Sequence, residues 1–183
     1  MKGFDFRARP HIAAAFFAMI AIVSASNYLV QFPINDWLTW GALTYPICFF
    51  ITEVTNRFHG AKVARRVVYA GFAIAVIFSV WLSTPRIAFA SGTAFLMSQL
   101  LDISVFNRFR QASWWSAPLF ASLSASAVDA GLFWNLAFWG EPVPFFTWAV
   151  GDFFVKCVLD IAMLSPFRMA IRASVTLEPK IGY

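Results

Sequence analysis

The stretch IAAAFFAMIAIVSASNYLV, which occupies Ile12–Val30, decides the fold class. It carries no charged residue, and its apolar residues do not alternate with polar ones over Ile12–Val23. About 20 helical residues cross the apolar core of a bilayer, whereas a strand of an outer-membrane barrel needs about ten alternating residues. Because lipid cannot satisfy open backbone groups, the stretch predicts a transmembrane helix.

The composition of the whole chain agrees with a membrane protein. The 183 residues are 60% hydrophobic and 13% charged, with a mean hydropathy of +0.69. A soluble domain averages roughly 45–50% apolar and about 25% charged residues. One soluble core of this size could not bury so much apolar surface. The composition therefore excludes a disordered chain, a nucleic-acid-binding domain and an ordinary cytosolic enzyme.

Six apolar stretches of about 18 to 26 residues are separated by short connectors. They are Ile12–Val30, Trp37–Val54, Val67–Thr84, Ile87–Phe106, Trp114–Trp139 and Val143–Pro166. The sequence predicts an all-α integral membrane protein, a single domain over residues 1–183 with six transmembrane helices. Pro46 lies inside the second stretch and is expected to kink it.

The basic residues predict the orientation. The connectors and ends on one side of the six spans carry 12 of the 14 basic residues: Lys2, Arg7, Arg9, Arg57, Lys62, Arg65, Arg66, Arg108, Arg110, Arg168, Arg172 and Lys180. Only Arg86 falls on the opposite side, and Lys156 lies within a span. The basic side of a membrane protein is cytoplasmic, so both termini are expected in the cytoplasm.

Ionisable side chains inside the predicted spans are the functional candidates, because each is costly in lipid. They are Glu53, Asp102, Asp129, Asp152, Lys156 and Asp160. The last three are spaced i, i+4, i+8 and share one face of the sixth helix. Asp152 and Lys156 are placed nearest the middle of the membrane.

Two of the acidic candidates also have a local structural interpretation. Glu53 can pair with Arg57 one turn later, at the level of the headgroups. Asp102 can form a bridge to Arg108 or Arg110. In either case the carboxylate would stabilise a helix end rather than bind a ligand.

The other polar candidates have structural alternatives as well. Asp152 and Lys156 can form a salt bridge within one helix. Asp129 has no basic residue within two turns, so it would be protonated or paired with another helix. Asn27 and Gln99 can hold helices together by hydrogen bonds.

Several chemistries are absent from the sequence. It contains no GxxxxGK[ST], HExxH, CxxC or GxSxG motif. We therefore expect no enzymatic activity, no cofactor, no metal site and no ATPase module in this chain. A driving force would then come from proton coupling or from metabolic trapping of the substrate.

An ordered series of short motifs runs along the chain. It comprises Ser26-Asn27-Tyr28-Leu29-Val30-Gln31, Thr39-Trp40-Gly41-Ala42, Thr52-Glu53-Val54, Ser98-Gln99-Leu100-Leu101-Asp102, Val105-Phe106-Asn107-Arg108, Asp129 with Phe133, and Asp152 with Lys156. In this order the motifs resemble the queuosine precursor transporter family, also called the vitamin uptake transporter family. The resemblance covers approximately residues 24–166. Asp160 does not belong to the family pattern.

The resemblance implies a function and a fold. It implies uptake of 7-cyano-7-deazaguanine and 7-aminomethyl-7-deazaguanine across a bacterial inner membrane. It also implies a six-helix fold akin to the substrate-binding components of energy-coupling-factor transporters. The runner-up hypothesis is a non-transporting scaffold or partner subunit whose buried charges only pair helices. A homodimer in the lipid bilayer remains a hypothesis.

The chemistry of the candidates is compatible with a guanine-like ligand. A carboxylate can accept the ring N–H and the exocyclic amine, amides can serve the other edges, and aromatic rings can cover the faces. The expected substrate-binding residues are Asn27, Glu53, Gln99, Asp102, Asp129, Trp134, Asp152 and Lys156.

Overall fold

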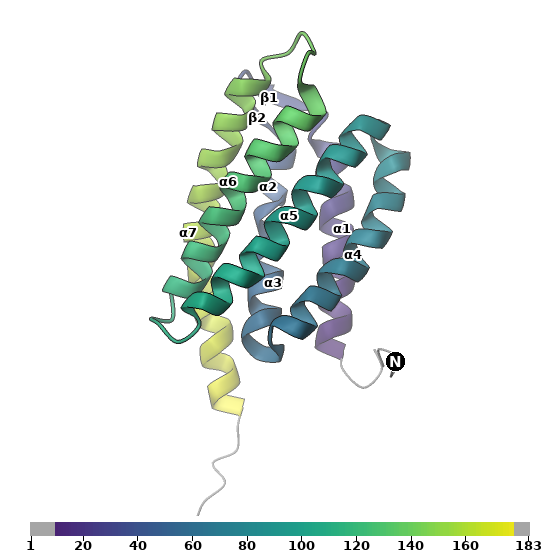
Figure 1. Cartoon of the computed structure of the whole chain (residues 1–183). Helices are drawn as coiled ribbons and strands as arrows, with labels where there is room; N and C mark the ends of the chain where they lie inside the picture. The colour runs from purple at the N-terminus through teal and green to yellow at the C-terminus, as the bar shows by residue number, and fades with distance from the viewer. Residues whose placement is uncertain (1–9, 178–183) are drawn as a thin grey trace, which may run out of the picture.

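The chain folds as an antiparallel bundle of helices with one small hairpin at one end (Figure 1). The computed structural model describes residues 10–177. Its elements are α1 Pro10–Leu29, β1 Pro33–Asn35, β2 Leu38–Thr39, α2 Gly41–Thr44, α3 Pro46–His59, α4 Ala61–Leu82, α5 Pro85–Phe109, α6 Ser116–Phe138 and α7 Phe145–Leu177. We call the end that holds β1 and β2 the hairpin end, and the end where α1 begins and α7 finishes the terminal end.

The helices have the character expected of a membrane protein. Six of the helices in the described part of the chain have 14 residues or more. Three of them, α1, α4 and α5, are long and apolar enough to cross a membrane by length and composition. Apart from the short hairpin the described chain is helical, which is consistent with the predicted all-α membrane protein.

The second predicted span differs from the structure at its start. A helix was expected from Trp37, but this residue lies between the antiparallel strands β1 and β2. The backbone N–H of Trp37 donates to Oδ1 of Asn35 at 2.8 Å, a local turn that competes with a helix. Farther on, Pro46 separates α2 from α3, because proline has no N–H to donate inside a helix. The kink expected at Pro46 is thus a division of the helix.

The last helix is longer than expected. The predicted span ends at Pro166, yet α7 continues through this proline to Leu177. Phe167 is buried against Phe106 of α5, with ring centroids 6.1 Å apart, and Ala121 of α6 belongs to the same apolar cluster. Tertiary packing on the next residue therefore keeps the helix intact where proline alone predicts an end.

The hairpin is fastened to the first turns of α7. The indole N–H of Trp148 donates to the backbone carbonyl of Asn35 at 3.1 Å. Gly151 lies directly under the carbonyl group of Trp37, leaving no space for a Cβ atom. The hairpin and α7 are therefore in close contact at the hairpin end of the bundle.

Basic side chains gather at the terminal end. Arg57, Lys62, Arg65, Arg66, Arg108, Arg110, Arg168 and Arg172 all lie in the helix ends or connectors there. Arg86 begins α5 at the hairpin end, where it pairs with Glu141 at 2.9 Å. The other basic residues of the sequence, Lys2, Arg7, Arg9 and Lys180, lie outside the described residues.

Replacement of Gly151 by alanine tests the contact between the hairpin and α7. The new methyl group collides with the backbone of Trp37, and overpacking of this kind typically costs about 1–3 kcal/mol. We expect Gly151→Ala to lower the thermal stability of the purified protein in detergent. The control is Gly131→Ala, where a Cβ atom meets nothing within 4 Å. Equal stability of the two variants would contradict the close contact.

Candidate functional site

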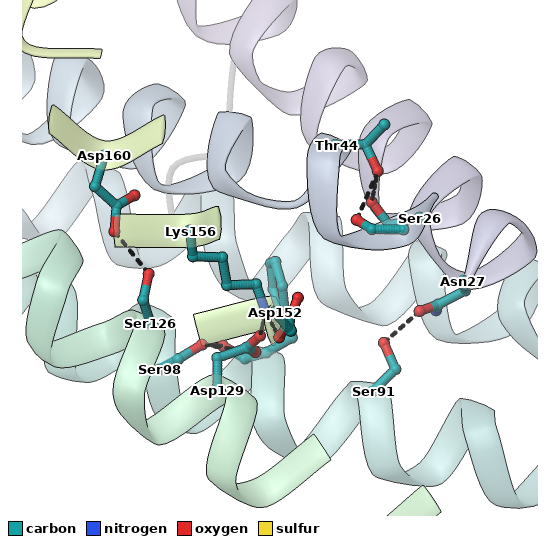
Figure 2. Close-up of polar contacts among 12 residues, drawn as sticks. Ser26, Asn27, Thr44, Ser91, Ser98, Ser126, Asp129, Asp152, Lys156 and Asp160 are labelled. Carbon is teal, nitrogen blue, oxygen red and sulfur yellow. Dashed lines mark hydrogen bonds and ion pairs between the residues drawn. The ribbon is translucent and has the colours of Figure 1, made fainter. Parts of the chain in front are cut away.

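A buried ion-pair cluster joins α6 and α7 in the hairpin half of the bundle. The ammonium group of Lys156 donates to Oδ2 of Asp152 at 2.6 Å and to Oδ2 of Asp129 at 2.6 Å (Figure 2). The side chains of all three residues are only 3–4% exposed. Two carboxylates and one ammonium group thus lie together, with a formal net charge of −1 when all three are ionised.

The helical spacing and the packing of three helices create this cluster. Asp152 and Lys156 are one turn apart on α7, so their side chains leave the helix on one face. Asp129 comes from α6, and Ser98 of α5 makes a long hydrogen bond of 3.4 Å to its Oδ1. The ammonium of Lys156 also lies 4.9 Å from the centre of the Tyr45 ring. Lys156 thus forms both the salt bridge within one helix, to Asp152, and the pairing of Asp129 with another helix that the sequence suggested.

A small cavity adjoins the ion-pair cluster. Its volume is about 20 Å³, enough for a single water molecule. Its walls combine polar groups, small residues and aromatic rings: Ser26, Asn27, Val30, Gly41, Ala42, Tyr45, Ser91, Asp129, Phe133, Trp134, Asp152 and Lys156. Five of the eight residues predicted to bind substrate lie in this wall.

Two further hydrogen-bonding groups of the cavity wall lie beside the carboxylates. Within residues 10–177, the hydroxyl of Tyr45 and the indole N–H of Trp134 are buried and make no hydrogen bond of regular geometry. Their neighbouring acceptors are the carboxylates of Asp129 and Asp152, respectively. Both groups can therefore also be reached by a molecule that enters the cavity.

Aromatic rings close the cavity on the side of α6. Phe133 and Trp134 meet edge to face, with ring centroids 5.2 Å apart. Trp134 also stacks on Phe138 at 5.2 Å and lies 5.5 Å from Trp148 of α7. This wall presents flat, apolar surface next to charged groups.

Asn27 is a structural part of the same wall. Its amide nitrogen donates to the hydroxyl of Ser79, and its Oδ1 accepts from Ser91 at 2.5 Å. Nearby, the hydroxyl groups of Ser26 and Thr44 are 2.6 Å apart. Asn27 therefore links α1 to α4 and α5, as its interpretation as a helix-joining amide predicted.

The other three predicted binding residues lie outside the cavity. Thr52 donates to Oε1 of Gln99 at 2.5 Å, and Glu53 and Asp102 lie on the same two helices, α3 and α5. All three predicted residues are buried, with an exposure of 3% or less. The structure thus divides the eight candidates into a cavity group and a separate group nearer the terminal end.

The local ion pairs considered for Glu53 and Asp102 are not formed. Arg57 instead donates to the carbonyl of Arg110 at 3.3 Å. Arg110 donates to the side chain of Asn56 at 3.1 Å and to two carbonyl groups of α3. These guanidinium groups stabilise the helix end by binding its free carbonyls, which explains why the carboxylates inside the bundle lack them.

Some residues of the site were missed at the level of sequence. Tyr45 carried no signal except its place before Pro46, where the helix is interrupted. Ser126 donates to Asp160 at 2.8 Å across α6 and α7, and its only signal was its spacing from Asp129. Asp160 is one of the ionisable candidates of the sequence, but the family pattern assigns it no role.

Comparison with known proteins places the chain in a family. A family model described as "Putative vitamin uptake transporter" matches residues 39–84 and 78–171. The chain belongs to the vitamin uptake transporter family. The "Queuosine precursor transporter" of Escherichia coli (strain K12) is 33% identical over 80% of this chain and 80% of its own. The "Probable queuosine precursor transporter" of Haemophilus influenzae (strain ATCC 51907 / DSM 11121 / KW20 / Rd) is 34% identical over 82% of this chain and 81% of its own.

The match confirms the resemblance that the ordered motifs indicated. No solved structure matches the chain. Both of these relatives are named as transporters, which supports a role of the chain in transport rather than in catalysis.

Removal of the central cation tests the ion-pair cluster. Lys156→Met leaves two buried carboxylates without a partner, and loss of one member of a buried pair typically costs about 3–5 kcal/mol. We expect a large loss of thermal stability, which the additional changes Asp129→Asn and Asp152→Asn should largely restore. The control Glu141→Gln removes an exposed ion pair and should cost at most about 1 kcal/mol. A Lys156→Met protein as stable as the wild type would contradict the pairing.

Proposed function

We propose that the chain is an inner-membrane uptake transporter for the queuosine precursors 7-cyano-7-deazaguanine and 7-aminomethyl-7-deazaguanine. The printed names of two relatives that each cover about 80% of the chain support this class of cargo. The observation that carries the proposal is the pair of buried carboxylates, Asp129 and Asp152, bridged by Lys156 in the wall of a cavity.

The polar groups of the cavity complement the edge of a guanine-like ring. A carboxylate of Asp129 or Asp152 can accept the ring N–H and the exocyclic amine together, as acidic groups do with base edges elsewhere. The carbonyl of the ring requires a donor, and Lys156 and the indole N–H of Trp134 supply one. The hydroxyl of Tyr45 adds a group that both donates and accepts.

The apolar part of the wall complements the ring faces. Base–aromatic stacking typically contributes about 1–3 kcal/mol per base. Phe133 and Trp134 provide the rings at the same level as the carboxylates. In this assignment the planar ligand lies between the aromatic wall on α6 and the small residues Gly41 and Ala42 of α2.

The cavity must enlarge to accept such a ligand. At about 20 Å³ it has room for water but not for a fused two-ring base. The arrangement corresponds to a closed state, in which Lys156 holds α6 against α7. Entry of the substrate would exchange one of the two ion-pair contacts of Lys156 for contacts with the ligand.

The scaffold alternative has one observation in its favour. Lys156 is fully paired and the cavity is small, as a protein that only packs its charges would require. The cavity itself favours the transporter, because its wall brings the hydroxyl of Tyr45 and the indole N–H of Trp134 beside the carboxylates of Asp129 and Asp152, where a ligand can reach them.

Uptake of a labelled precursor tests the function, and a change at Asp129 tests the site. Expression in cells that cannot make queuosine should restore queuosine in tRNA from low external 7-cyano-7-deazaguanine. Asp129→Asn loses a charge-assisted contact worth about 1.5–3 kcal/mol, so binding to the purified protein should weaken about ten- to a hundredfold. The control Glu141→Gln should bind like the wild type. Equal tRNA modification with and without the chain would exclude the function, and unchanged binding in Asp129→Asn would move base recognition to another residue.

The charge asymmetry gives the proposed orientation, with both termini in the cytoplasm. Arg86 is the one basic residue of the hairpin end in the described chain, whereas eight lie at the terminal end. A reporter that is active only in the periplasm should therefore stay silent when fused after Tyr183. The same reporter inserted at Gly140, in the connector between α6 and α7, should be active. The reverse result would invert the proposed direction of the cavity.

A further inference from the structure

Two carboxyl groups lie close together in the terminal half of the bundle. Glu53 belongs to α3 and Asp102 to α5, and these helices pack against each other. The hydrogen bond between Thr52 and Gln99 joins the same turns, because Glu53 follows Thr52 directly and Asp102 follows Gln99 by three residues. Asp102 contributes the strongest of the charges that act on Glu53.

Three of the four oxygens of these two carboxyl groups lack a hydrogen-bond partner in the described chain. Glu53 is 3% exposed and Asp102 is 0% exposed. In the chain from residue 10 to residue 177, both oxygens of Asp102 and Oε1 of Glu53 have no hydrogen-bond partner. Burial of one ionised carboxylate without a partner costs several kcal/mol, and two adjacent ones repel each other as well. Such a pair is stable only when it carries a bound positive charge.

The charged side chains around Glu53 and Asp102 do not provide this positive charge. Within the described chain, Asp102 and Asp160 are the charges that act on Glu53, and Asp160 also acts on Asp102. Asp160, from α7, adds a third acid rather than a cation. Lys156, one turn away on α7, is held by Asp129 and Asp152. From α6, the hydroxyl of Ser126 donates to Asp160 at 2.8 Å, and the charge of Asp129 also acts on Asp160.

Arg57 and Arg110, two cations of the terminal end, already have other hydrogen-bond partners. Arg57 and Arg110 bind backbone carbonyls and the side chain of Asn56. Two further groups next to the pair, the side-chain amide nitrogens of Asn56 and Gln99, are buried without a partner in the described part of the chain. Asn56 is one turn from Glu53, and Gln99 is one turn from Asp102. Each amide N–H can donate to a carboxylate oxygen that stays ionised while the other carboxyl group is protonated.

We propose that Glu53 and Asp102 share one bound proton and are the site through which a proton gradient drives this transporter. The identity of the cargo rests on the proposed function, whereas the proton site does not. No group of three or more His, Cys, Asp or Glu residues in the described chain could hold a metal ion. Two carboxyl groups that share a site typically retain one proton between them.

Ser126 and Asp160 are polar groups on the two helices that also carry the ion-pair cluster of the cavity wall. Asp129 in the cavity wall is three residues from Ser126 on α6, and Ser126 donates to Asp160 at 2.8 Å. Asp160 in turn acts on both members of the pair. In the proposed cycle, a carboxylate oxygen of Glu53 or Asp102 accepts a proton from water on the cavity side and becomes an O–H group. The same proton is later released to water at the terminal end, about 10 Å along the helix from Glu53.

Infrared spectroscopy of the full-length protein without substrate tests the proton site by itself. A buried protonated carboxylic acid has a C=O stretch separate from that of carboxylates. We expect this band at neutral pH in the wild type and in the control Glu141→Gln, and its loss in the double variant Glu53→Gln/Asp102→Asn. If the double variant does not fold, Asp102→Asn alone should weaken or shift the band. A wild type without the band, or variants that retain it unchanged, would overturn the proposal.

Transport in proteoliposomes tests the coupling. With the cavity side more acidic by about one pH unit, one proton per substrate gives about tenfold accumulation of 7-cyano-7-deazaguanine. The double variant should no longer accumulate the compound and should only equilibrate it across the membrane. Accumulation by the variant equal to that of the wild type would overturn the coupling. If the wild type neither binds nor moves the compound, the proposed cargo is wrong, and the infrared result still decides the proton site.

Discussion

The ammonium group of Lys156 makes it feasible to bury two aspartates between α6 and α7. A single carboxylate in lipid is already costly, and two of them from different helices would force the helices apart. The cation contacts both at 2.6 Å and so turns a repulsion into a junction. The cavity, its aromatic wall and the close approach of α6 to α7 are all arranged around this one contact.

The remaining polar contacts follow a common physical rule. With little water inside a bundle of this kind, a hydroxyl or an amide finds its partner on a neighbouring helix. Asn27, Thr52 and Ser126 each connect two or more helices in this way. Against this background the groups without a regular hydrogen bond in residues 10–177 are informative, because most of them lie in the cavity wall or in the cluster of buried acids and amides of the terminal half.

The sequence was sufficient for the helices and for the shared face of Asp152 and Lys156, because both depend on spacing along one segment. It was not sufficient for the partner of Asp129, since contacts between helices depend on which helices are neighbours. The same limit applies to Glu53 and Asp102. Their nearest cations in sequence, such as Arg57, bind carbonyls at a helix end instead. The predicted start of the second helix at Trp37 was wrong for a different reason. The Asx turn at Asn35 outweighed the apolar character of the residues after it.

The attachment of the hairpin to α7 has a mechanical consequence. Trp148 and Thr147 both donate to hairpin carbonyls, and Trp148 is two turns, about 12 Å, from Lys156 on the same rigid helix. Any displacement of α7 that separates Lys156 from α6 must therefore carry the hairpin with it. The exposed hairpin and the buried charge of Lys156 are thus mechanically coupled through α7. An antibody fragment that binds the hairpin would therefore restrict the motion of α7 without entering the protein interior.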